Sequence, residues 1–156
     1  FLITPLNPRK HGANLTDEKG RFQMASLALA DENGLVASDF EFSLPRPSYT
    51  INMLDALERS YPGCEFLLLM GADNWLKIDK WYKSEEILSR FGLIGYPRGN
   101  EEKPLLPDNV RWLSSPLYDI SSTEVRHAIS CGHDISEWLH PDVLDFIKEN
   151  KLYTSL

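Results

Sequence analysis

The chain has 156 residues, 42% of them hydrophobic and 25% charged, which suits one globular domain over residues 1–156. Its formal net charge is −7, from 16 basic and 23 acidic residues, which argues against nucleic acid as the main partner. No apolar run approaches a membrane span and no signal peptide is recognisable, so we expect a cytoplasmic protein without a membrane partner. The two cysteines have no metal-like spacing, and no metal site built from side chains is expected.

The first third of the chain predicts two strands and two helices. An apolar run at residues 1–4 predicts a strand, and apolar residues at helical spacing predict a helix from about residue 16 to 30. Alternation of apolar and polar residues from 35 to 42 predicts a second strand. Ser48 is expected to be the N-cap of a second helix, whose apolar residues begin at Ile51.

The rest of the chain alternates in the same way. Residues 66–70 form a continuous apolar run, which predicts a strand covered on both faces. A helix, two strands and two helices are then expected at 84–90, 91–96, 110–113, 121–130 and 141–150. This order predicts an α/β fold, a Rossmann-like parallel sheet with helices on both faces, in which ligands bind at the carboxyl ends of the strands.

Three consecutive hydroxyl side chains, Ser121, Ser122 and Thr123, stand where a late helix is expected to begin. A helix N-terminus offers free N–H groups and a positive dipole end, which favour phosphate, and Arg126 adds a guanidinium one turn later. The spacing of Ser121 and Glu124 is also typical of a capping box. Both interpretations stay open, since one turn can cap itself and bind phosphate.

Two further segments indicate a nucleotide. Gly71 and Asp73 directly follow the apolar run 66–70, where glycine permits close approach of a ligand and a carboxylate can accept from ribose hydroxyls. The alternative for Asp73 is an N-cap of the next short helix. Trp81 and Tyr82 could stack on an electron-poor ring, which gains about 0.5–2 kcal/mol, or cover the sheet as core residues.

The segment Ile120–Arg126 resembles the I-S-S-T-x-x-R motif of the nucleotidyltransferase superfamily. Together with Ser48-Tyr49-Thr50, the G-x-D segment at Gly71 and the Trp81-Tyr82 pair, it resembles the nicotinate-nucleotide adenylyltransferases along essentially the whole chain. The resemblance implies a fold of the nucleotidyltransferase type.

The resemblance also implies the site residues. Arg126 would be catalytic, and the ATP-binding residues would be Gly71, Asp73, Arg98, Ser121, Ser122, Thr123 and Arg126. The mononucleotide would contact Lys10, Thr50, Trp81 and Tyr82. Lys10 and Arg98 belong to segments whose residue order departs from the family's P-P-H-K and R-P-G patterns. Arg21 matches an R-x-x-M pattern and is interpreted as helix packing with charge in a first turn.

One departure concerns the catalytic signature of the superfamily, H-x-G-H. No two of the four histidines have this spacing. The resemblance therefore implies that the first strand, the first helix and the catalytic histidine pair lie upstream of Phe1, and that the domain is N-terminally incomplete. Because buried backbone groups would then lack partners, we expect that these residues do not fold alone as a stable, active monomer.

The activity that the resemblance implies is transfer of the adenylyl group of ATP to nicotinate mononucleotide, which gives nicotinate adenine dinucleotide and pyrophosphate in NAD biosynthesis. Mg²⁺ would be bound mainly through the ATP phosphates. Nicotinamide mononucleotide or phosphopantetheine are alternative acceptors, although a pantetheine arm has no ring for Trp81 to stack on. A non-catalytic nucleotide-binding module is a further alternative, and association into a homo-oligomer is left open.

Overall fold

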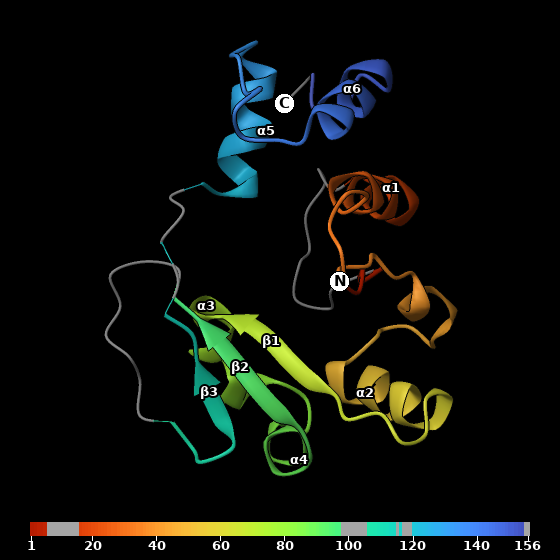
Figure 1. The fold of residues 1–156 in the computed structure, drawn as a ribbon, viewed down its shortest axis with the longest axis vertical. Helices are drawn as coiled ribbons and strands as arrows, with labels where there is room; N and C mark the ends of the chain where they lie inside the picture. Colours follow the sequence, from red (N-terminus) through yellow and green to blue (C-terminus); the bar gives the residue numbers. More distant parts are fainter. Residues whose placement is uncertain (6–15, 98–105, 115, 117–119, 155–156) are drawn as a thin grey trace. The chain divides into compact units, whose positions relative to one another are not determined.

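The computed structural model describes residues 1–5, 16–97, 106–114, 116 and 120–154. By its internal contacts the chain divides into two compact units, Phe1–Ser48 with Ile120–Leu156, and Tyr49–Asp119. Figure 1 shows the first unit as the helices α1 (Glu18–Ala28), α5 (Ser122–Ser130) and α6 (Pro141–Glu149), and the second as a small sheet with helices beside it. The single-domain organisation stays a prediction.

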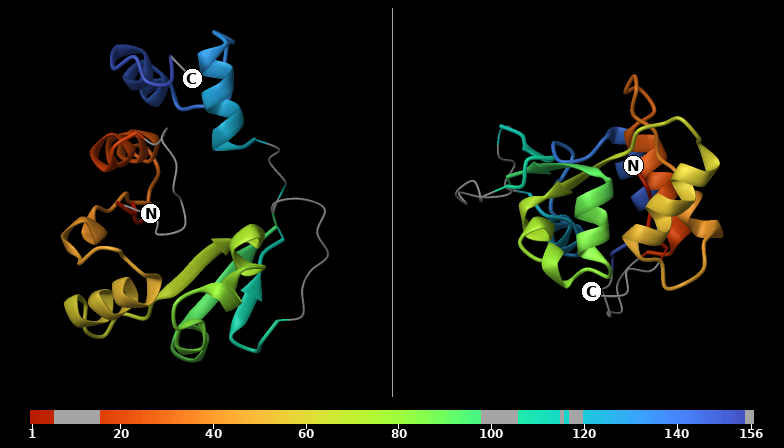
Figure 2. Two further views of the ribbon diagram at one scale, coloured as in Figure 1. Left: turned by 180° about the vertical axis from the view of Figure 1, so that it is seen from behind. Right: turned by 90° about the horizontal axis from the view of Figure 1, so that it is seen from below.

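The second unit is built on three parallel strands. They are β1 (Leu67–Gly71), β2 (Gly92–Tyr96) and β3 (Val110–Trp112), in the order β1-β2-β3. Leu68 is in register with Leu93, and Leu93 with Val110, so their side chains share one face of the sheet. Figure 2 shows the same strands from behind. The parallel sheet expected from the sequence is confirmed, and the expected strands end within one residue of the observed ones.

One face of this sheet carries the core of the unit. Met70, Leu93, Val110 and Ile78 are buried together, and partly buried residues of the crossover pack around them. The crossover from β1 to β2 consists of α3 (Ala72–Trp75), η2 (Ile78–Lys80) and α4 (Ser84–Arg90). On this face the indole of Trp112 lies directly against the backbone of Gly95. Any larger residue at position 95 would place its Cβ atom inside the space that the ring occupies.

The opposite face of β1 is more open than the sequence predicts. Leu67 and Leu69 point to that face and are 52% and 54% exposed. The expectation that residues 66–70 are covered on both faces is therefore wrong for the described part of the chain. A continuous apolar run does not state which of its two faces the neighbouring elements cover.

Helix α2 (Thr50–Ser60) carries the apolar face that the sequence predicts, with Ile51, Leu54 and Leu57 buried. An ion-pair cluster fastens it to α4. Nη2 of Arg90, the last residue of α4, lies 2.8 Å from Asp55 and also contacts Glu58. Because Nη1 of the same guanidinium binds a carboxylate of α4 itself at 2.6 Å, Arg90 joins the two helices.

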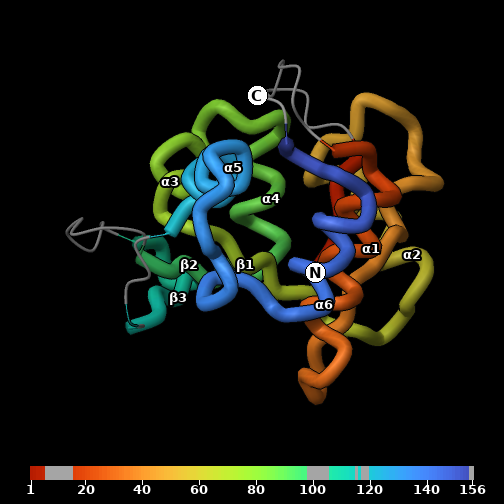
Figure 3. Tube along the Cα trace, turned by 90° about the horizontal axis from the view of Figure 1, so that it is seen from above, coloured from red at the N-terminus to blue at the C-terminus, as the bar shows by residue number. Residues whose placement is uncertain are grey.

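The first unit is mainly helical, with α1 (Glu18–Ala28), η1 (Phe40–Ser43), α5 (Ser122–Ser130) and α6 (Pro141–Glu149). Helices α1 and α6 lie side by side, as Figure 3 shows. The Thr16 hydroxyl donates to the Tyr153 hydroxyl, which ties the start of α1 to the segment after α6. Val143 and Ile147 form the buried face predicted for α6, with Phe146 half-buried beside them.

The strand predicted at residues 35–42 is wrong. Only Ser38 is paired there, in an isolated parallel bridge to Leu2, and a 3-10 helix begins at Phe40. That bridge is also all that the described residues show of the strand expected at residues 1–4. The alternating pattern is misleading because its apolar positions Leu35 and Val36 are exposed and Glu41 is buried.

The buried Glu41 also explains how α2 begins. Ser48 Oγ donates to Glu41 Oε1 at 2.5 Å, and both side chains are about 95% buried, at 5% and 4% exposure. The N-cap of α2 is consequently Tyr49, which makes no side-chain capping bond. The expectation that Ser48 caps this helix is wrong, because its hydroxyl satisfies a buried carboxyl group instead.

Candidate functional site

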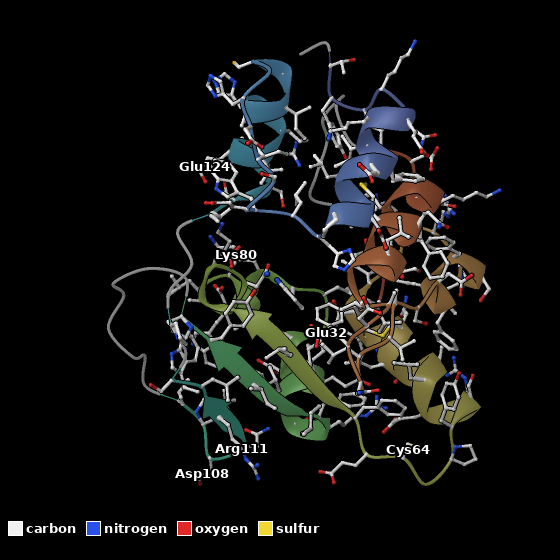
Figure 4. All side chains as sticks on the ribbon, turned by 45° about the horizontal axis from the view of Figure 1, so that its top comes forward. Glu32, Cys64, Lys80, Asp108, Arg111 and Glu124 are labelled. Atoms are coloured by element: carbon white, nitrogen blue, oxygen red, sulfur yellow. The ribbon has the colours of Figure 1, made fainter. Side chains whose placement is uncertain are left out.

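The hydroxyl-rich turn at the start of α5 has the geometry of a capping box. Ser121 Oγ accepts from the Glu124 N–H at 3.2 Å, and the Glu124 carboxylate accepts from the Ser121 N–H at 2.7 Å. Figure 4 shows Glu124 at this end of the helix. The side chain of Ser121 and, second, its N–H lower the pKa of Glu124. The interpretation of this segment as a capping box is thereby confirmed.

The capping box leaves part of the turn available to a ligand. Within the described part of the chain, the N–H groups of Ser122 and Thr123 have no acceptor, and both residues are exposed. Arg126 lies one turn on, half-buried, and its Nη2 donates to Thr123 Oγ1 at 3.2 Å. Two free N–H groups, two hydroxyls and a guanidinium on one helix end are the donors that phosphate oxygens require.

The end of β1 supplies a second candidate set. Gly71 is the last residue of the strand and the N-cap of α3, and Asp73 lies half-buried in the first turn of that helix. The alternative that Asp73 is itself the N-cap is therefore wrong. The position is nevertheless the carboxyl end of a parallel strand, where ligands of such sheets bind.

The aromatic pair predicted to face a pyridine ring is split by the structure. Trp81 is half-buried and packs against the core that contains Met70 and Leu93. Tyr82 is 51% exposed, and its ring lies 4.7 Å from the ring of Tyr49, centroid to centroid. Tyr49 directly precedes Thr50, so the structure brings Tyr82 to the start of α2, where one of the predicted substrate residues lies.

One residue whose contacts were missed is Arg21 in α1. Its Nη1 and Nη2 donate to the carbonyl oxygens of Thr4 and Pro5 at 2.7 and 2.9 Å, and its Nε donates to the carbonyl of Thr16 at 3.1 Å. The R-x-x-M pattern singled this residue out but indicated packing and first-turn charge. Its actual partners are backbone groups, which leave no trace in the amino-acid sequence.

Lys10 and Arg98 lie outside the described residues. The remaining candidates fall into two sets, one on α5 in the first unit, and one at β1, α2 and Tyr82 in the second. Among the described residues, no group of three or more His, Cys, Asp or Glu side chains could hold a metal ion.

Comparison with known proteins gives consistent results. The cytidylyltransferase-like family model matches residues 1–128. A protein of Bacteroides fragilis named nicotinate-nucleotide adenylyltransferase is 45% identical over 145 residues, which are 92% of this chain and 72% of that protein. A Flavobacterium johnsoniae protein of the same name is 39% identical over an alignment of 161 positions, which covers 98% of this chain and 81% of that one.

Among solved structures, the nicotinic acid mononucleotide adenylyltransferase of Plasmodium falciparum, complexed with NaAD, superimposes with a TM-score of 0.76. The match covers 99% of this chain and 82% of that chain at 19% identity, so it shows the fold alone. No described helix has the length and apolar character that crossing a membrane would need.

The parallel sheet and the superposition define a nucleotidyltransferase fold, which confirms the fold class expected from the sequence. The chain belongs to the cytidylyltransferase-like family and, within it, to the nicotinate-nucleotide adenylyltransferases. The resemblance found in the sequence is thereby confirmed.

Proposed function

We propose that this protein transfers the adenylyl group of ATP to nicotinate mononucleotide. The observation that carries the proposal is the identity of 45% over 145 residues with a relative of that name. A phosphate oxygen of the mononucleotide forms a bond to the α-phosphorus of ATP, and the bond from that phosphorus to the β-phosphate bridging oxygen breaks. The products are nicotinate adenine dinucleotide and pyrophosphate, and no protein nucleophile is needed.

The α5 turn is suited to holding the ATP phosphates. Ser122 and Thr123 offer N–H groups and hydroxyls, and Arg126 carries a permanent positive charge beside Thr123. These groups hold the phosphates in position and stabilise charge that develops on the transferring group. A divalent metal, which we propose to be Mg²⁺, supplies further charge neutralisation when bound through the phosphates. Gly71 and Asp73 are proposed to lie against the adenosine, and Thr50 beside the pyridine carboxylate.

The alternatives differ in the acceptor. Pyrophosphate release with Mg-ATP is to be measured with the complete gene product that contains these 156 residues, and with three acceptors: nicotinate mononucleotide, nicotinamide mononucleotide and phosphopantetheine. Strong preference for the nicotinate compound supports the proposal, and preference for another acceptor replaces it. A folded protein that turns over none of them would be a nucleotide-binding module.

The role of Arg126 has its own test. Arg126→Ala is expected to reduce kcat by about 10²–10³-fold, the usual effect of removing one transition-state donor. Circular dichroism should stay unchanged, because the capping box of α5 involves Ser121 and Glu124. Arg111→Ala, which removes an exposed arginine on β3, is the matched control and should keep the parent kcat. Near-normal turnover of Arg126→Ala would remove this residue from the site.

A further inference from the structure

The hydroxyl group of Thr50 is held by no side-chain contact of its own. Thr50 is half-buried as the first residue of α2, and no group in the described part of the chain forms a hydrogen bond with its side chain. Tyr49, the N-cap of the helix, makes no side-chain capping bond either. The place of the Thr50 hydroxyl therefore depends on how the backbone around it is held.

Two buried residues hold this backbone, one on each side of Thr50. Ile51, which follows it, is fully buried. Ser48, which stands two residues before it, is 5% exposed and donates its hydroxyl hydrogen to Glu41. One anchor is therefore apolar, and the other is a hydrogen bond to a buried carboxyl group.

The chain that leads into α2 is held only weakly before it reaches Ser48. Residues 45–47 are exposed. Arg46 forms an ion pair with Glu18 at 2.7 Å, but both side chains are partly exposed, and surface pairs of this kind hold a chain only loosely. The bond between Ser48 and Glu41 is thus the first firm contact ahead of Thr50.

A buried carboxyl group and hydroxyl group do more than supply stability. An apolar pair of similar shape would be about as stable, because neither partner would have to give up its contact with water. The polar pair adds direction, since its hydrogen bond fixes Ser48 Oγ at 2.5 Å from Glu41 Oε1. Glu41 lies in η1, so this bond fixes the entry to α2 on that 3-10 helix.

We propose that Glu41 is a positioning residue of the acceptor site: through Ser48 it sets where the Thr50 hydroxyl lies, and thereby the preference for an acceptor that bears a carboxylate. The inference rests on the proposed function, which gives Thr50 its ligand. Glu41 touches no substrate itself, and it acts on binding of the acceptor and not on binding of ATP.

An apolar replacement of the pair separates positioning from stability. In the complete gene product, the double variant Glu41→Met with Ser48→Ala removes both polar groups, so its melting temperature should stay close to that of the parent. The KM for nicotinate mononucleotide should nevertheless rise about tenfold, the effect of losing one hydrogen bond to the ligand, while kcat and the KM for ATP stay at the parent values. The KM for nicotinamide mononucleotide should rise less, because hydrogen bonds to charged groups are the stronger ones.

Two controls accompany the double variant. Ser43→Ala removes an exposed serine hydroxyl from the same 3-10 helix, one that donates to the Phe40 carbonyl at 3.0 Å, and it should keep every KM at the parent value. Val143→Ala shortens a buried side chain of α6, so it should lower the melting temperature and keep the acceptor KM. An acceptor KM that stays at the parent value in the double variant, or rises equally in Val143→Ala, would overturn the inference.

Equilibrium binding separates failure of the inference from failure of the proposed function. Calorimetric titration of the parent and of the double variant with nicotinate mononucleotide needs no turnover. A parent that binds the compound without turning it over contradicts the proposed reaction, and tenfold weaker binding by the double variant would still support the role of Glu41. A parent that does not bind the compound would overturn both.

Discussion

Ser48 could stabilise the protein as the N-cap of α2 or as the donor to the buried Glu41, and the two roles predict opposite effects of one substitution. Both side chains are almost fully buried, and the serine hydroxyl donates to the carboxyl group at 2.5 Å. Ser48→Ala removes the donor and leaves the carboxyl oxygen without it. The resulting loss in the free energy of unfolding should exceed the loss that follows removal of an ordinary helix cap.

The magnitude follows from the kind of group that is left behind. A buried group that loses its partner costs about 1–3 kcal/mol, whereas loss of a serine N-cap typically costs about 1 kcal/mol. We expect Ser48→Ala in the complete gene product to lower the free energy of unfolding in urea by about 2 kcal/mol, as measured by tryptophan fluorescence. In a double-mutant cycle, Glu41→Gln should be coupled to Ser48→Ala by at least about 1 kcal/mol.

Ser48→Asp distinguishes the two roles. Aspartate is among the best N-caps, so a capping position would tolerate it or gain stability. Next to Glu41 it places a second carboxyl group in a buried site, which should destabilise the protein more than Ser48→Ala does. A Ser48→Asp protein as stable as the parent, or additive energies in the cycle, would refute the role assigned to this pair.

Two other predictions concern α2 and α5. Arg90→Met removes the ion pairs that join the end of α4 to Asp55 and Glu58 of α2, so the protein should lose stability. The melting temperature should fall in Arg90→Met and stay at the parent value in Arg59→Met, which changes an exposed arginine of α2; equal melting temperatures for the two variants would exclude a stabilising role of these ion pairs. The capping box of α5 should be complete above the ordinary pKa of a glutamate and lost as pH falls through the lowered pKa of Glu124. Protection of the amides in the first turn of α5 from hydrogen exchange should fall with this titration in the parent but not in Glu124→Gln. The same protection in the two proteins at every pH would exclude a stabilising role of the Glu124 carboxylate.

Local patterns predicted the elements whose side chains repeat with a clear period. Helix α4 has the predicted bounds, and α5 and α6 differ from prediction by one residue at an end. The strands β1 and β2 follow from apolar runs that end at glycine or proline. These elements satisfy their own backbone groups or bury one regular face, so sequence spacing is enough to find them.

The rest depends on partners that are distant along the chain. Residues 35–42 alternate like a strand, but the burial of Glu41 depends on Ser48, which the alternation cannot indicate. Trp81 and Tyr82 are both aromatic in the sequence, and only the structure shows that Trp81 packs against the core whereas Tyr82 is 51% exposed. The segment at α5 is recognisable because cap and phosphate donors share one turn, and the capping box, one of its two interpretations, is confirmed.

The backbone contacts of Arg21 have a consequence for how this protein can vary. One guanidinium holds the carbonyl oxygens of Thr4, Pro5 and Thr16, so the two points where residues 6–15 leave and rejoin the described chain are fixed by a side chain outside that segment. One Arg21→Ala substitution would therefore release three carbonyl oxygens at two separate points of the chain, so its cost to stability should exceed that of an ordinary exposed arginine.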